Sequence, residues 1–595
     1  MTFHWIERFS ENFRSNSNLL IPLLFIFNLV LVFPIFFPNL SNIDPWDESI
    51  YINSGRGLID GGCLRQFAGN PLLSFLYALI YIPVKSTTFW LIHSCTIGRF
   101  ILFSLMWFSA YLVATQLRYL AHPFIMIALL FTSPALTYLL PNPSDALFTA
   151  MSAFTLWQVL LFYNKKKVRH VWLASLFVGL SALSRNDGLI LFFILIIIAV
   201  ILSIPAKRLG TSLIACVIPF IILVAGYLII YGLVMGRFEL GIIGRTYLAF
   251  EQGQGFAYEK SPADGQIDAR QLFGTPEENQ YSFLSAIKRN PEAFFDRVRQ
   301  TIKTSPKKIY FIYGERLGII SLLLAAMGAM VLARKRLYPL LVALLLWSTH
   351  LFVYFLTFFR HEYFLFPYFA VFSLASMGLT SIVYSFKKRI HYCWSLALLG
   401  LAIFGMLSNR PNLFSATVFF LVWVWIVRYV MNRYRHLEAI KTIGLVLALC
   451  ALLFLKVGYP YPKFRTLGTA PDEKAVLFMK EHLKPGSLVF AAAPGPIWEA
   501  KMNFGPLDFT LRDKNENDLS YGHLFYGKAV YANDTLRYDE PGLVSKIERL
   551  IGKGLEVGYE SENKEVQILL VDEKYSKKST CSIQCHTKML HKDKR

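Results

Sequence analysis

The stretch that decides the fold is residues 39–62, which read Asn-Leu-Ser-Asn-Ile-Asp-Pro-Trp-Asp-Glu-Ser-Ile-Tyr-Ile-Asn-Ser-Gly-Arg-Gly-Leu-Ile-Asp-Gly-Gly. It is the first long polar interruption in a largely apolar sequence, and it places the carboxylates of Asp44, Asp47 and Glu48 within five positions. After Pro45 the apolar residues recur at helical spacing, which predicts an amphipathic helix on a membrane surface. A plainer alternative stays open, in which Asp44 or Asp47 caps a surface helix.

The composition identifies the class of protein. Of 595 residues, 55% are hydrophobic and only 17% are charged, and the mean hydropathy is +0.44. A soluble chain of this length would not show that balance, so the sequence predicts a polytopic α-helical membrane protein. The net charge of +21 comes mostly from short clusters between apolar runs. We interpret it as a topology signal with some attraction to anionic membrane lipids, and we expect no nucleic-acid partner.

Apolar runs that can form helices follow one another along most of the chain. They lie at 19–38, 71–84, 97–117, 121–140, 144–163, 168–184, 187–205, 210–234, 317–334, 338–358, 363–386, 392–408, 413–431 and 440–457. No small-residue cleavage site follows the first run, which indicates an uncleaved transmembrane helix rather than a signal peptide.

Basic clusters orient these runs across the membrane. The clusters at 165–167, 207–208, 334–336, 387–389 and 433–435 are predicted to face the cytoplasm. The polar loops 39–70 and 235–316 and the chain after 458 then lie outside. An inside N-terminus and an outside tail require an odd number of crossings, so we expect one run between 71 and 117 not to span. The run 71–84 is the shortest, and we predict about 13 transmembrane helices in all.

The predicted organisation has three parts. Residues 1–457 form the transmembrane domain, 458–573 a soluble extracytoplasmic α/β domain, and 574–595 a basic flexible tail. The α/β domain is expected to have helices at 472–483 and 541–551 and strands at 487–493 and 566–571. The loop 235–316 is long enough to be a lid or substrate platform, although a merely tolerated insertion is an equal alternative.

The seven cysteines give little functional information. Five of them, Cys63, Cys95, Cys216, Cys393 and Cys450, lie in or beside apolar stretches, where cysteine behaves as a small hydrophobic residue. Cys581 and Cys585 have one residue too many between them for a haem-attachment motif. A disulfide and two idle thiols are the alternatives for this pair.

Polar residues in the membrane part of the chain are informative because charges are costly inside a bilayer. Most gather at the predicted outside ends of the helices, at Asp47, Glu48, Arg56, Asp145, Arg185, Asp187, Arg360, His361, Glu362 and Tyr363. This convergence favours one extracytoplasmic site. Plainer interpretations are that Asp145 is an N-cap, Asp187 a turn residue and Glu362 a partner of Arg360. Arg99, near the start of the apolar run 97–117, is interpreted as reaching a lipid headgroup.

Three short motifs occur in a familiar order. Asp47-Glu48-Ser-Ile-Tyr51 follows the first apolar run, Ser184-Arg185-Asn-Asp-Gly-Leu lies in mid-chain, and residues 358–367 read Phe-Phe-Arg-His-Glu-Tyr-Phe-Leu-Phe-Pro. Over roughly residues 19–390 this arrangement resembles the GT-C superfamily of polyprenyl-phosphate-sugar-dependent glycosyltransferases. It is most similar to the branch that contains the protein O-mannosyltransferases and the aminoarabinose transferase of lipid A.

One departure from that branch is evident. Where relatives often carry Lys-Pro-Pro-Leu before the second run, this chain has Gly69-Asn70-Pro71-Leu72. A phosphate-binding lysine is therefore absent, and its role must fall to another group or be dispensable.

The resemblance implies transfer of a sugar from a polyprenyl phosphate to a lipid, glycan or protein acceptor outside the membrane. It implies Asp47 as general base with Glu48 beside it, and Arg185 and Arg360 as ligands of the leaving phosphate. Substrate contacts are assigned to Tyr51, Asp145, Asp187, His361, Glu362 and Tyr363. One base without a protein nucleophile implies inversion at the anomeric carbon. A divalent cation held by Asp47, Glu48 or Glu362 is left open, since no spacing demands one.

Two other classes stay as alternatives to an enzyme of the bacterial inner membrane. A lipid or solute transporter would place polar residues or broken helices near the bilayer midplane and show paired halves, and neither is evident. A scaffold protein would not need acidic and basic groups on one face. The sequence therefore favours an enzyme, and it identifies neither the sugar nor the acceptor.

The predicted topology can be tested by thiol labelling. In a variant without the seven native cysteines, Ser261→Cys and Asn533→Cys should react with a membrane-impermeant thiol reagent in intact cells, because both positions are predicted to lie outside. Lys166→Cys should react only after permeabilisation. Labelling of Lys166→Cys without labelling of Asn533→Cys would place the acidic loop in the cytoplasm.

Overall fold

The computed structural model divides the chain into two compact units. The described residues are 47–60, 71–118, 139–204, 207–235, 245–260, 262–309, 319–349, 367–384, 471–491, 495–506, 529–533, 555–561 and 566–572, with a few single positions besides. The first unit combines Met1–Phe33, Leu102–Leu140 and Ser144–Tyr461, and the second combines Pro34–Ile101, Pro141–Pro143 and Pro462–Arg595. The acidic stretch 39–62 thus belongs to the same unit as the C-terminal part of the chain. The predicted domain boundary at 457/458 stays a prediction.

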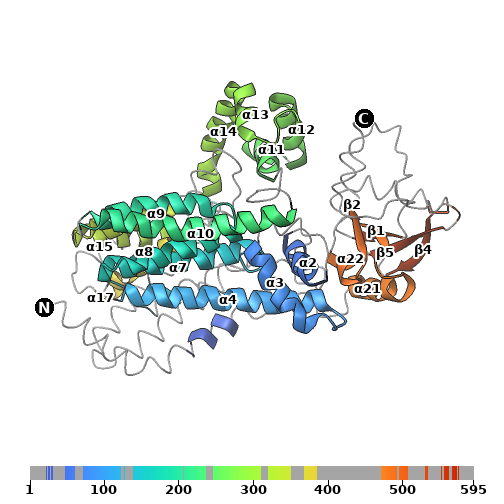
Figure 1. Cartoon of the computed structure of the whole chain (residues 1–595), viewed down its shortest axis with the longest axis horizontal. Helices are drawn as coiled ribbons and strands as arrows, with labels where there is room; N and C mark the ends of the chain where they lie inside the picture. The colour runs from blue at the N-terminus through green and yellow to red at the C-terminus, as the bar shows by residue number, and fades with distance from the viewer. Residues whose placement is uncertain are drawn as a thin grey trace. The chain divides into compact units, whose positions relative to one another are not determined.

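Long helices make up most of the described part of the first unit (Figure 1). They are α7 (Pro143–Lys165), α8 (Arg169–Ser184), α9 (Gly188–Ser203), α10 (Leu209–Met235), α15 (Ile319–Arg334), α16 (Tyr338–Thr349) and α17 (Tyr368–Tyr384). Helix α4 (Trp90–Gln116) begins in the second unit and ends in the first. Among the described residues, three helices are long and apolar enough to cross a membrane: α4, α7 and Leu209–Leu233 of α10. The predicted total of about 13 transmembrane helices stays a prediction.

Helices α7 to α10 form consecutive antiparallel hairpins, so their connecting loops lie at the two ends of the bundle. Phe154 of α7 stacks on Phe177 of α8 with ring centroids 5.1 Å apart, and Phe192 of α9 stacks on Phe220 of α10 at 3.9 Å. At one end the two basic loops meet, because Arg208 donates to the carbonyl of Lys166 at 3.1 Å. The structure therefore gathers two of the predicted cytoplasmic clusters at one end of the bundle.

Burial distinguishes the centre of this bundle from its surface. The apolar window of α7 is 89% buried, whereas that of α10 is only 33% buried. The exposed apolar residues of α10 include Ile214, Ile218 and Ile222, which recur every fourth position and so lie on one face of the helix. This face has the character of a lipid-facing surface, since a helix that is apolar towards its surroundings is suited to a bilayer.

Two glycines allow helices α15 and α17 to pack closely against each other. A Cβ atom added at Gly328 of α15 would lie 1.9 Å from the carbonyl oxygen of Leu374, and one added at Gly378 of α17 would lie 2.0 Å from that of Leu324. The two backbones can touch only because both positions lack a side chain. This is the packing that membrane helices use where the hydrophobic effect does not drive association.

A folded unit of four helices occupies much of the predicted loop 235–316. It consists of α11 (Arg245–Ala257), α12 (Pro262–Phe273), α13 (Phe283–Arg289) and α14 (Pro291–Ile309). Its core contains Tyr247, Phe250, Ala269, Phe273, Ala286 and Phe294. The side chain of Arg297 closes this core, because it lies 4.2 Å from the centroid of the Phe250 ring and donates to the Phe250 carbonyl at 2.9 Å. Burial lowers the pKa of Arg297 to about 10.

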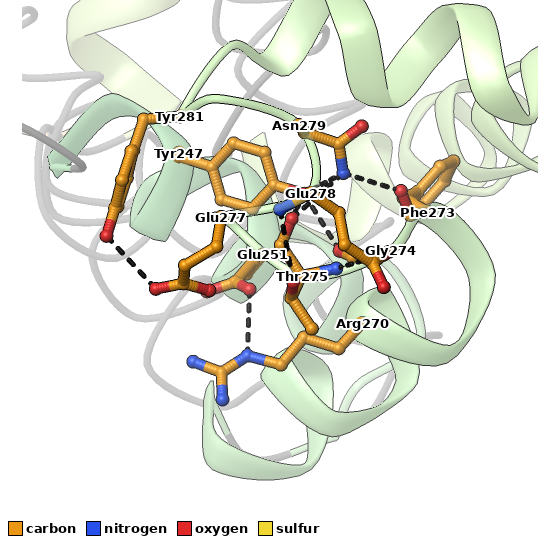
Figure 2. A network of polar contacts seen from close by, with 10 residues as sticks. All are labelled: Tyr247, Glu251, Arg270, Phe273, Gly274, Thr275, Glu277, Glu278, Asn279 and Tyr281. Carbon is orange, nitrogen blue, oxygen red and sulfur yellow. Dashed lines mark hydrogen bonds and ion pairs between the residues drawn. The ribbon is translucent and has the colours of Figure 1, made fainter. Parts of the chain in front are cut away.

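Polar contacts fix the turn between α12 and α13 (Figure 2). The Tyr247 hydroxyl donates to the carbonyl of Gly274 at 2.9 Å, and the Asn279 amide donates to the Tyr247 oxygen at 2.9 Å. The buried Glu251 carboxylate accepts from Arg270 at 2.9 Å. Burial raises the pKa of Glu251, and the Arg270 guanidinium opposes that shift. The loop thus has a defined internal structure, and its role as a lid or platform stays a prediction.

The C-terminal part of the second unit contains a five-stranded sheet. Its strands are β1 (Leu488–Ala491), β2 (Asn503–Pro506), β3 (Ala529–Asn533), β4 (Leu555–Glu560) and β5 (Val566–Val571), in the order β2-β1-β3-β5-β4. Strand β1 pairs in parallel with β2 and β3, and β5 pairs antiparallel with β3 and β4. Helices α21 (Pro471–His482) and α22 (Gly495–Glu499) accompany the sheet.

The predicted α/β character of this region is confirmed. The helix expected at 472–483 corresponds to α21, and the strands expected at 487–493 and 566–571 correspond to β1 and β5. The helix expected at 541–551 lies outside the described residues except for its last position. The short β2, β3 and β4 strands were not predicted, because each depends on a neighbour in the sheet rather than on a strong local pattern.

Helices α2 (Asp47–Asp60) and α3 (Pro71–Val84) form the N-terminal part of the second unit. At 14 residues, α3 is about 21 Å long, which is shorter than a bilayer core of about 30 Å. It packs closely on α2, because a Cβ atom at Gly55 would lie 2.5 Å from the backbone of Tyr77. The expectation that one run between 71 and 117 does not span stays a prediction, and α3 is a shorter apolar helix than α4.

The glycine contact between α15 and α17 predicts a large effect of a single methyl group. Gly328→Ala should destabilise the protein by about 1–3 kcal/mol, because the added carbon overlaps a backbone carbonyl and the helices must separate. Thermal unfolding in detergent micelles would measure the change. Gly226→Ala in α10 is the matched control, since a Cβ there meets no atom within 4 Å and alanine favours a helix. Equal stability of Gly328→Ala and wild type would contradict the described packing.

Candidate active site

The acidic pair of the quoted stretch lies at the start of α2. Asp47 is the first residue of the helix, while its side chain lies outside the described part of the structure. The next residue, Glu48, has no exposed surface. A helix forms here because the apolar residues that follow Asp47 have helical spacing. The two neighbouring carboxylates therefore enter the helix in its first turn, where negative charge is favoured.

Glu48 is paired with a cation that lies well inside α4. Its Oε2 accepts from Nη2 of Arg99 at 2.5 Å, and its Oε1 accepts from Nε of Arg99 at 2.9 Å. The Cys95 thiol donates to the same Oε1 at 3.0 Å. Both charged side chains are almost completely buried, with 1% exposure for Arg99 and none for Glu48. The Glu48 carboxylate is thus engaged by protein donors on both oxygens.

Small and aromatic residues surround this pair. The Tyr77 ring lies over Gly98, where an added Cβ would come within 2.6 Å of it. Tyr51, one turn after Asp47, is 3% exposed and belongs to the core. The Glu48–Arg99 pair, the lack of a side chain at Gly98 and the buried Tyr51 together fix how α2, α3 and α4 meet.

A second polar cluster lies in the first unit, where α7 begins and α8 gives way to α9. Arg185 follows the last residue of α8, and its Nε donates to Oδ2 of Asp187 at 2.8 Å. Its Nη1 donates to Oδ1 of Asp145 in the first turn of α7. The Ser144 hydroxyl also donates to Asp145, at 3.3 Å. The side chains of Asp145, Arg185 and Asp187 have exposures of 9%, 17% and 19%, so the cluster is partly open.

Of the plainer interpretations, the turn at Asp187 is confirmed, whereas Asp145 is the third residue of α7 and not its N-cap. Asp187 precedes the first residue of α9, yet its side chain makes no capping hydrogen bond. It turns to Arg185 instead. One cation and two carboxylates give the Asp145–Arg185–Asp187 cluster a formal charge of −1. An arginine already held by two carboxylates binds an additional phosphate less readily than a free one would.

The remaining predicted residues lie outside the described part of the chain. These are Arg360, His361, Glu362, Tyr363 and Asp44. Within the described part, no three His, Cys, Asp or Glu side chains come together as metal ligands would. Glu48 is an unsuitable metal ligand in this arrangement, because both its oxygens face donors. A metal held by Asp47 or Glu362 stays a prediction.

Two functional contacts were missed from the sequence. Arg99 was assigned to a lipid headgroup, and the structure corrects this, since its guanidinium binds Glu48 in the interior. The sequence did contain a signal, because an arginine within an apolar stretch needs an acidic partner if it cannot reach water. Glu499 of α22 was not singled out at all, although it is buried without exposed surface.

Comparison with known proteins identifies the fold. No protein-family model matches the sequence, and no curated protein sequence matches it. The crystal structure of ArnT from Cupriavidus metallidurans bound to undecaprenyl phosphate matches with a TM-score of 0.51 and 11% sequence identity, over 93% of this chain and 98% of that chain. The apo structure of the same protein matches with a TM-score of 0.50 over the same shares. The chain has the GT-C fold.

The GT-C fold confirms the resemblance inferred from the three sequence motifs. A third match, an oligosaccharyltransferase from Archaeoglobus fulgidus tethered to an acceptor peptide, has 13% identity and a TM-score of 0.49 over 93% of this chain and 74% of that chain. The three apolar helices of membrane-spanning length in the described residues support the predicted integral membrane protein.

The Glu48–Arg99 pair predicts an asymmetric mutational response. Glu48→Gln or Arg99→Gln alone should destabilise the protein by about 3–5 kcal/mol, because each leaves a buried charge without its counterion. The double variant carries two neutral amides and should recover a large part of that loss. Thermal unfolding in micelles measures all three, with the exposed Glu292→Gln on α14 as control. Additive losses in the double variant would show that the two residues act independently.

Proposed function

We propose that this protein is an integral membrane glycosyltransferase that moves a sugar from a polyprenyl-phosphate-linked donor to an acceptor outside the membrane. The observation that carries the proposal is the GT-C fold over 93% of the chain in a sequence that starts α2 with an acidic pair. ArnT, which shares the fold, has been crystallised with undecaprenyl phosphate. The proposal extends that donor class to this chain, and leaves the sugar and the acceptor class undefined.

Asp47 acts as the general base in this proposal. An acceptor hydroxyl is a weak nucleophile, so a carboxylate must take its proton while the new bond to the anomeric carbon forms. The bond from that carbon to the phosphate oxygen breaks at the same time, and the phosphate leaves with the electron pair. Attack opposite to the leaving phosphate in one displacement inverts the anomeric centre.

The burial of Glu48 supports the choice of Asp47 between the two neighbours. Glu48 has no exposed surface and faces Arg99 and Cys95, so a substrate hydroxyl would have to displace an internal ion pair to reach it. Glu48 fits a supporting role instead, in which it holds α2 on α4 and fixes the first turn that carries Asp47.

Arg185 and Arg360 are assigned to bind the leaving phosphate, and Arg360 is assigned the larger part in stabilising its charge. The forked donors of arginine match phosphate oxygens, and a donor directed at the developing charge stabilises the transition state. Arg185 already holds Asp145 and Asp187, which suits a residue that orients these carboxylates towards substrate. The absent lysine before Pro71 makes the contribution of Arg360 more necessary.

The proposed orientation places the chemistry outside the membrane. The Asp145–Arg185–Asp187 cluster and the loops containing Lys166 and Arg208 lie at opposite ends of the α7–α9 hairpins. Basic loops are retained on the cytoplasmic side, which favours an extracytoplasmic position for the acidic end. The α11–α14 unit follows the end of α10 that is remote from these basic loops, which suits an acceptor platform.

Asp47→Asn tests the proposed function. The purified protein is incubated with a panel of polyprenyl-phosphate sugars, and mass spectrometry follows their hydrolysis or transfer. Wild type should consume at least one donor, whereas Asp47→Asn should lose about 10²-fold or more of the rate with donor binding retained, because the amide cannot take the proton. Asp296→Asn on the exposed face of α14 is the matched control. Turnover by Asp47→Asn within a few-fold of wild type would exclude Asp47 as the base.

A further inference from the structure

Helix α22 contacts α2 and α4 within the second unit. A Cβ atom at Gly495 would lie 3.2 Å from the Ser49 hydroxyl of α2 and 3.9 Å from the Leu91 side chain of α4. Arg56 of α2 donates to the carbonyl of Trp498 at 3.4 Å, and its guanidinium lies 5.3 Å from the centroid of the Trp90 ring. The five-residue α22 is thus packed against α2 and against the first turn of α4.

A buried carboxylate lies at the centre of this junction. Oε2 of Glu499 accepts from the backbone N–H of Leu91, the second residue of α4, at 2.8 Å. Its Oε1 forms an ion pair with Nζ of Lys480 on α21 at 3.5 Å. Lys480 also donates to the carbonyl of Thr88, just before α4. One carboxylate therefore satisfies a free amide at a helix start that is 408 positions away in the sequence.

The junction is close in the chain to the proposed catalytic region. Ser49, which α22 covers, follows Glu48 directly. Leu91 precedes Arg99 by eight residues on α4, or about 12 Å along the helix axis. The two helices that are joined internally by the Glu48–Arg99 pair are thus held at their ends by Glu499 and its neighbours.

We propose that Glu499 is a positioning residue through which the C-terminal domain fixes the starts of α2 and α4, and with them the Glu48–Arg99 pair and Asp47. The catalytic consequence rests on the proposed function, whereas the structural one does not. Loss of the carboxylate would free the first turn of α4, so α2 would lose its fixed partner. The C-terminal domain thereby becomes part of the machinery that shapes the site.

The charge at this junction responds to pH. Lys480 from α21 and Arg56 from α2 face Glu499, and Lys501 lies near Lys480. Burial raises the pKa of Glu499 to about 7, while Lys480 and the α4 amides oppose that shift. A carboxyl with a raised pKa binds its proton more tightly when docked than when detached. The contact is therefore strongest below the ordinary carboxyl pKa and weakens as the pH rises through about 7.

Hydrogen exchange of the full-length protein in lipid nanodiscs tests the positioning role. In Glu499→Ala, amides of residues 88–95 should exchange about tenfold or more faster than in wild type, because the first turn of α4 loses its acceptor. Glu499→Gln keeps an oxygen for the Leu91 amide and should stay near wild type. Glu481→Ala, at an exposed position of α21, is the control. Unchanged exchange in Glu499→Ala, or an equal increase in Glu481→Ala, would overturn the proposal.

The second arm compares pH and activity. Exchange of amides 88–95, corrected for intrinsic rates, should rise between pH 6 and 8 in wild type and stay flat in Glu499→Gln. A parallel rise in both proteins would overturn the role of this carboxyl. This comparison does not depend on whether Glu499→Ala folds. In the donor assay, Glu499→Ala should lower kcat about tenfold or more with little change in KM, and Glu499→Gln should restore it. Faster exchange without any transferase activity in wild type would refute the proposed function and leave the structural role intact.

Discussion

The second unit depends on one constraint, which is that a guanidinium cannot stay inside an apolar helix without a counterion. Arg99 lies within α4, a helix with the length and composition of a membrane span, and it is 1% exposed. Glu48 supplies the counterion with two hydrogen bonds. Leaving either charge unpaired costs more free energy than most packing defects. The pair therefore restricts the first turn of α2 to a single position relative to α4.

That constraint determines the surroundings of Glu48, whose two carboxylate oxygens accept from Arg99 and Cys95. A carboxylate that is fully engaged by protein donors makes a poor base, and its fixed position makes a good anchor. In the other unit, Arg185 forms ion pairs with Asp145 of α7 and with Asp187, just before α9. Each cluster thus joins helices that are separate in the sequence.

The segments outside the apolar helices have more structure than their polar composition suggests. The α11–α14 unit has its own aromatic core and a turn fixed by Tyr247 and Asn279. The C-terminal part of the second unit contacts α4 through Glu499 and α2 through the backbone carbonyl of Trp498. Buried polar groups of this kind must be satisfied, so both segments have a specific conformation rather than a loose one.

The sequence determined the membrane class, the apolar helices, the basic loops and the α/β character of the C-terminal region, because each follows from local composition or spacing. It also indicated Asp47, Glu48, Asp145, Arg185 and Asp187 as residues worth examining. Only the tertiary structure decided that Glu48 meets Arg99, that Arg185 lies between two carboxylates, and that Glu499 caps a helix 408 positions away. Local spacing cannot specify these pairs, since a buried charge requires a partner but does not determine which one the fold will bring to it.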